Sequence, residues 1–148
     1  MNRKRQRGVR CAAASLLAAV LVLAGVPVRA ANTDPTLALL SASAVRGSSG
    51  RATLTLETSF SFDDAIQLSL PIDVIVTQGA RVARCGLSGS VSVDGVPQPA
   101  GASGVIAVTD RRLTVVLPPE FTAGEATVQL VTDYSRKPIA SNVLRFTL

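Results

Sequence analysis

The chain has 148 residues, enough for one domain. Its formal net charge of +5 is unevenly distributed, because six of the 15 basic residues lie in the first thirty positions and all 10 acidic residues lie after them. Residues 31–148 therefore carry a net charge of −1, from nine basic and ten acidic side chains. This balance argues against a nucleic-acid partner, which requires a basic patch on the folded domain.

Residues 1–30 are predicted to form a secretory signal peptide. A basic start, Met1–Arg10, precedes the apolar run Cys11–Val26, and Val28-Arg29-Ala30 places small residues at the −3 and −1 positions of a cleavage site. The run is shorter than the about 20 residues that span a bilayer, which favours cleavage over a retained anchor. We expect residues 31–148 to be one secreted, periplasmic or extracellular domain with no membrane span.

The first half of this domain predicts three strands. Thr36–Val45 is apolar, and Arg51–Phe60 alternates apolar with polar residues. After an expected loop at Ser61–Ala65, every even position of Ile66–Thr77 is apolar, whereas the positions between are mostly polar. That alternation indicates a strand with one buried face. Pro71 lies on its polar side and leaves two linked strands as an equal alternative, because proline has no N–H for a sheet.

The second half predicts six more short strands, separated by turn signals such as Asp94-Gly95 and by loops at Pro97–Gly104 and Asp133–Ser141. The strands are Arg81–Leu87, Ser90–Val93, Val105–Val108, Leu113–Leu117, Glu125–Thr132 and Asn142–Leu148. No stretch after the leader shows an apolar stripe of helical period. About seven to nine short strands with frequent turns predict an all-β, antiparallel immunoglobulin-like β-sandwich.

Residues 91–148 resemble the immunoglobulin-like domain shared by plexins and transcription factors, the IPT/TIG domain. The matching features are the Asp94-Gly95 turn, the strand that leads to Pro118, the Ala123-Gly124 turn, the Val-rich strand that follows it, and Ser141-Asn142 before the last strand. The resemblance implies a sandwich fold and no catalytic residue. Members serve as adhesion, ligand-binding, dimerisation or spacer modules, and fold alone does not choose among these roles.

The side chains available limit the chemistry. The chain has no histidine, which removes the usual general base and the commonest transition-metal ligand. Cys85 is the only cysteine after the leader; it is predicted to be a buried small hydrophobe, with an intermolecular disulfide or a reactive thiol as alternatives. We therefore predict no enzyme and no catalytic, cofactor-binding or metal-binding residue.

Four charged features are candidate sites, and we interpret each of them as solvated surface. Asp63-Asp64 could join a calcium site but lacks the spacing of a calcium loop. Asp73 is expected to point outward from its strand. Arg111-Arg112 and Arg136-Lys137 could contact an acidic glycan or partner, but two charges create little steering field.

Three functions follow, in order of preference. The first is an exported, non-catalytic module that binds an unknown protein or glycan at the cell surface. The second is a self-assembling structural subunit, a homo-oligomer joined by edge strands such as Asn142–Leu148. The third is a carboxylate- or calcium-dependent hydrolase.

Overall fold

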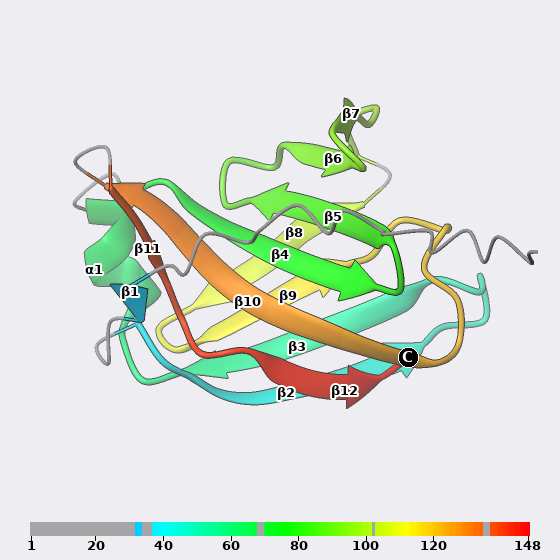
Figure 1. The fold of residues 1–148 in the computed structure, drawn as a ribbon, viewed down its shortest axis with the longest axis horizontal. Coiled ribbons are helices and arrows are strands. Elements are labelled where there is room, and N and C mark those ends of the chain that lie inside the picture. The colour runs from blue at the N-terminus through cyan, green and yellow to red at the C-terminus, as the bar shows by residue number, and fades with distance from the viewer. Residues whose placement is uncertain (1–31, 34–36, 68–69, 102, 135–136) are drawn as a thin grey trace, which may run out of the picture.

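The computed structural model describes residues 32–33, 37–67, 70–101, 103–134 and 137–148. They form two packed β-sheets (Figure 1), so the predicted all-β, mostly antiparallel sandwich is confirmed. The leader, its cleavage site and Cys11 lie outside the described residues.

The larger sheet has eight strands, and its long central strand is β10 (Glu125–Tyr134). One edge of β10 pairs with β4 along most of its length, and the other edge is shared by two short strands. In spatial order the main path is β1 (Asn32–Thr33), β11 (Lys137–Ala140), β10, β4 (Ile72–Gln78), β5 (Arg81–Gly86), β6 (Val91–Val93) and β7 (Val96–Pro97), and β12 (Leu144–Thr147) also pairs with β10.

The smaller sheet has four strands in the order β2 (Leu39–Arg46), β3 (Ala52–Thr58), β9 (Arg112–Val116) and β8 (Gly104–Thr109). Each edge of this sheet approaches the larger one: β2 lies beside β12, and β8 lies near β5. Where β8 approaches the larger sheet, a Cβ atom on Gly104 would lie 2.6 Å from the Val91 side chain. Glycine at position 104 therefore permits the close approach of the two sheets.

The core fills the space between the sheets with aliphatic side chains from alternate strand positions. In the smaller sheet Leu54 pairs with Val115 and Leu56 with Leu113, and all four are fully buried. In the larger sheet the buried positions of β4, β5 and β10 face them in the same way: Ile72, Val74, Val76, Ala83, Cys85, Ala126, Val128 and Leu130. The period-two pattern in the sequence therefore identified the buried faces correctly.

All nine predicted strand segments contain an observed strand. The predictions missed β1, β7 and β11, so the described residues form 12 strands and the expected seven to nine was too low. The loop predicted over Asp133–Ser141 was wrong, because β10 continues to Tyr134 and β11 follows it. β11 forms because its backbone pairs with β10, although the sequence of Lys137–Ala140 shows only a weak strand pattern.

The sequence also failed to predict a helix. Residues 61–65 were expected to be a loop and Ile66 the start of a strand, but Phe62–Gln67 forms α1. Phe62 and Ala65, three positions apart on one helix face, are buried at the end of the core, whereas Ile66 is 52% exposed. β4 starts immediately after Pro71, so the interruption that proline signalled is real.

A polar clasp closes the seam between β2 and β12. The Asn142 side-chain amide accepts a hydrogen bond from the Leu39 backbone N–H at 2.8 Å and donates one to the Leu39 carbonyl at 3.0 Å. The preceding residue, Ser141, is fully buried, and its hydroxyl oxygen accepts from the Leu130 backbone N–H at 2.8 Å. The Ser141 hydroxyl therefore supplements the backbone hydrogen bond from the Ser141 N–H to the Leu130 carbonyl where β10 changes partner from β11 to β12, and Asn142 ties this point to β2.

We predict that Asn142→Ala lowers the free energy of unfolding by about 1–3 kcal/mol, because two hydrogen bonds worth about 0.5–1.5 kcal/mol each are lost. The free energy of unfolding of Asn142→Asp should lie between those of the wild type and Asn142→Ala, because a carboxylate accepts a hydrogen bond from the Leu39 N–H but cannot donate one to the Leu39 carbonyl. Urea denaturation measures both. Val143→Ala is the control at the exposed neighbouring position, and equal effects of Asn142→Ala and Val143→Ala would contradict the clasp.

Two buried threonines should respond in opposite ways to valine. The Thr132 hydroxyl has no hydrogen-bond partner in the described part of the chain, whereas the Thr58 hydroxyl donates to the Phe60 carbonyl at 2.7 Å. Thr132→Val should leave stability unchanged or raise it by up to about 1 kcal/mol, and Thr58→Val should lower it by about 1 kcal/mol. Thermal and urea unfolding of both variants test this, and a similar loss in both would refute the assignment.

Candidate functional site

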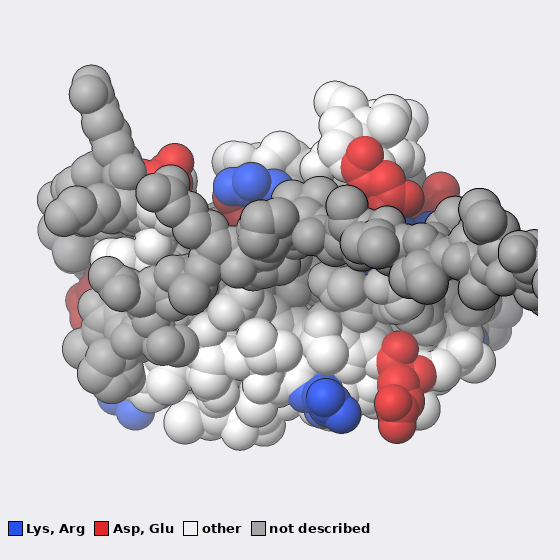
Figure 2. All heavy atoms as spheres, viewed as in Figure 1, with Lys and Arg blue, Asp and Glu red and all other residues white. Residues whose placement is uncertain are grey.

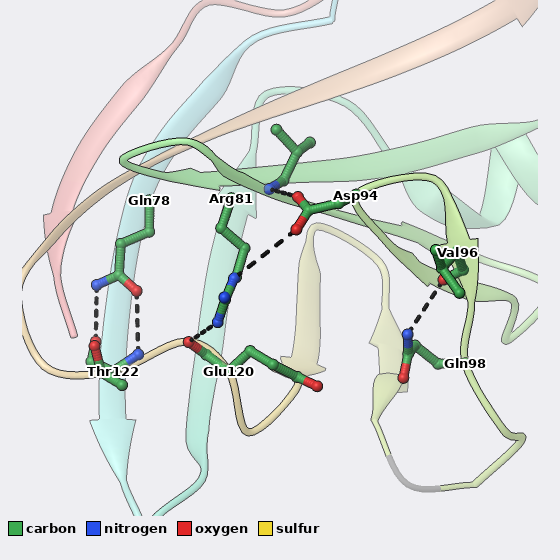
Figure 3. Close-up of polar contacts among 8 residues, drawn as sticks. Gln78, Arg81, Asp94, Val96, Gln98, Glu120 and Thr122 are labelled. Atoms are coloured by element: carbon green, nitrogen blue, oxygen red, sulfur yellow. Dashed lines mark hydrogen bonds and ion pairs between the residues drawn. The ribbon is translucent and has the colours of Figure 1, made fainter.

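Three turns meet at one end of the sandwich and border an open groove of about 520 Å³, whose lining residues are mostly polar. They are the β4–β5 turn, the β6–β7 turn and the loop between β9 and β10 (Figure 3). We call this the loop-end groove; its lining residues are Gln78, Gly79, Ala80, Arg81, Asp94, Glu120, Thr122, Gly124 and Glu125. Loops held by a rigid sheet scaffold are a common place for binding sites.

The sequence builds these turns with residues that accept a left-handed backbone. Gly79 has φ +59° in the β4–β5 turn. Asp94 and Gly95 have φ +50° and +82° in the β6–β7 turn, the geometry that an Asp-Gly pair favours in a two-residue hairpin. The Asp94 carboxylate also accepts a hydrogen bond from the Val82 backbone N–H at 2.8 Å, which ties this turn to β5.

Side chains of the β4–β5 turn hold the third loop. The Gln78 amide donates to the Thr122 carbonyl at 2.8 Å and accepts from the Thr122 backbone N–H at 3.1 Å. The Arg81 guanidinium donates to the Glu120 carbonyl at 2.8 Å. Figure 3 shows these contacts side by side along the loop. The loop between β9 and β10 is therefore braced by side-chain to backbone hydrogen bonds from both strands of the β4–β5 hairpin.

The lining residues include three carboxylate side chains, those of Asp94, Glu120 and Glu125, and one cation, Arg81. The Arg81 Nε and Asp94 Oδ2 atoms are 3.9 Å apart, and the two side chains are 43% and 51% exposed. Because both groups are largely solvated, their ion pair contributes little to stability. Glu120 contributes its backbone carbonyl to Arg81, while its carboxylate points away from that arginine (Figure 3). The Asp94 carboxylate is already engaged by the Val82 N–H and by Arg81, and the described lining residues hold no nucleophile paired with a base.

The acidic residues singled out from the sequence lie in separate places. Asp63 and Asp64 occupy the first turn of α1 and are exposed. Asp73 does face outward, as expected, but it is paired: its carboxylate accepts hydrogen bonds of 2.8 and 2.5 Å from Arg84 on the neighbouring strand. Across the described residues, no group of three or more acidic or cysteine side chains could hold a metal ion.

The basic pair Arg111-Arg112 lies in the β8–β9 turn and at the start of β9. Arg112 donates to Glu57 at 2.6 Å, and this hydrogen bond, assisted by one from Ser41, lowers the pKa of the Glu57 carboxyl. The Arg111 Nε lies 3.8 Å from the carboxylate of its neighbour Asp110. Arg136 and the side chain of Lys137 lie outside the described residues.

Charge does not mark a binding surface elsewhere on the visible face. Figure 2 shows acidic and basic side chains in small separate groups on the described part of that face, without an extended patch of one sign. Steering of a highly charged partner requires such a patch.

A second hollow, of about 430 Å³, lies between α1, the start of β4, the end of β5 and β8. We call it the edge crevice; it is lined by Ile66, Leu70, Pro71, Ile72, Asp73, Gly86, Leu87, Ser88 and Val108. Its walls are mainly apolar, in contrast to the loop-end groove.

Cys85 is fully buried on the inner face of β5, as predicted. Burial, assisted by the negative charge of Asp73, raises the pKa of its thiol to about 11. The thiolate is the reactive form of cysteine, so the folded domain keeps this side chain inert near neutral pH.

Sequence reasoning did not single out the groove residues. Gln78, Arg81, Glu120 and Thr122 come from turns about 40 residues apart along the chain, since the two hydrogen-bonded pairs are separated by 44 and 39 positions. The signals were three turn dipeptides, Gln78-Gly79, Asp94-Gly95 and Ala123-Gly124, which located the turns without bringing them together.

Comparisons with protein families, with characterised proteins and with solved structures find no match for this chain. None of the helical segments that the structure describes has the length and apolar character needed to cross a bilayer.

We predict that Cys85 reacts with Ellman's reagent only after unfolding. In a Cys11→Ser variant Cys85 is the one remaining thiol, and a pKa of about 11 leaves roughly one thiol in a thousand ionised at pH 8. Labelling of the native protein should be at least a hundredfold slower than in urea. Comparable rates in the two states would show an accessible thiol.

The same shift predicts how stability depends on pH. The folded-state pKa of about 11 exceeds the unfolded value of 9.0, so the unfolded chain loses the proton first. The contribution of Cys85 is complete below pH 9 and is lost as pH rises toward 11, and Cys85→Ala should lose this alkaline dependence in urea titrations.

Proposed function

We propose that the protein is an exported, non-catalytic β-sandwich module that binds a protein or glycan at or outside the cell surface. The leader pattern in residues 1–30 supports export, and the resemblance of residues 91–148 to IPT/TIG domains supports a binding role.

The loop-end groove is the observation that carries this proposal. It is concave, it lies where the turns of a sandwich gather, and its loops are braced by the Gln78–Thr122 and Arg81–Glu120 hydrogen bonds. A braced loop loses little conformational entropy on binding, so a partner can be held by few contacts. Immunoglobulin-like domains use the loops at one end of the sandwich in this way.

The chemistry of the side chains supports recognition without turnover. Activation of a serine or cysteine nucleophile commonly uses histidine, which this chain lacks. The buried thiol of Cys85 has its pKa raised away from the reactive range. Carboxylates in the groove can accept hydrogen bonds from hydroxyl, amide or ammonium groups, which suits a glycan or a protein surface.

An arginine placed in the groove tests the site. Ala80 is an exposed, non-glycine lining residue, so Ala80→Arg fills the groove while leaving the bracing hydrogen bonds in place. Fluorescently labelled wild-type protein should bind saturably to cells of the organism that makes it. Ala80→Arg should raise the dissociation constant for this binding at least tenfold. Treating the cells with protease or glycosidase then distinguishes a protein from a glycan partner.

The matched control is Ala107→Arg, the same substitution at an exposed position of β8 in the smaller sheet. It should bind like the wild type. Equal binding by Ala80→Arg and wild type would remove the groove from the proposal, and the absence of saturable binding would remove the binding role. Turnover of a glycoside, ester or peptide substrate that is lost on changing one Asp or Glu would show an enzyme.

Self-assembly through strand edges is the second candidate. β12 lies between β10 and β2, so this terminal strand is already engaged within the domain. The observation that favours assembly is β8, the edge strand of the smaller sheet, whose bulge residue Ile106 is 61% exposed. Unpaired edges accept a further strand from another chain, although a bulge weakens such pairing.

If β8 joins copies of the chain, light scattering after size-exclusion chromatography should show a mass that increases with protein concentration. Ile106→Lys should return the protein to a monomer, because it places a charge at the edge. Val45→Lys, at a similarly exposed apolar position on the opposite edge strand β2, is the control. A monomer at every concentration would exclude this candidate.

A further inference from the structure

No further inference is drawn: the strongest candidate, the edge crevice of about 430 Å³ between α1, the start of β4, the end of β5 and β8, has mainly apolar walls, but nothing in the structure shows what covers it.

Discussion

The fold depends on satisfying backbone hydrogen-bonding groups where β10 changes partner. A buried backbone N–H or carbonyl without a partner costs about as much as a lost hydrogen bond, so a strand that leaves a sheet edge needs a substitute. The Ser141 hydroxyl accepts a hydrogen bond from the Leu130 N–H. The Asn142 side-chain amide accepts from the N–H of Leu39 in the other sheet and donates to its carbonyl. These two adjacent residues let one sheet edge accommodate β11 and β12 and fasten the second sheet beside them.

The two hollows described above lie at the loop end and beside α1. The loop-end groove forms where long side chains of the β4–β5 turn reach the loop that leads into β10. The edge crevice forms where α1 covers the end of the core next to the β8 edge. One hollow is polar and braced by hydrogen bonds and the other is apolar, which is why the binding proposal rests on the first.

The lack of histidine and the burial of Cys85 both limit how a nucleophilic side chain could be activated in this chain. A sandwich core made of Val, Leu and Ala accommodates a thiol as another small hydrophobe, and the low polarity around it opposes ionisation. The exposed charged groups form local pairs, such as Asp73 with Arg84 and Glu57 with Arg112. Such exposed pairs stabilise the surface weakly.

The sequence by itself determined the fold class, the faces of the main strands and the burial of Cys85, because alternation of apolar residues is a local property that a pleated strand converts directly into inside and outside. It also located Asp94-Gly95 and Ser141-Asn142. Tertiary structure decided what those residues do: α1 forms because Phe62 and Ala65 find a core to cover, β11 forms because β10 offers an edge, and the groove exists because three distant turns meet. The burial of α1 and the groove depend on contacts across long sequence separations, which no local pattern records.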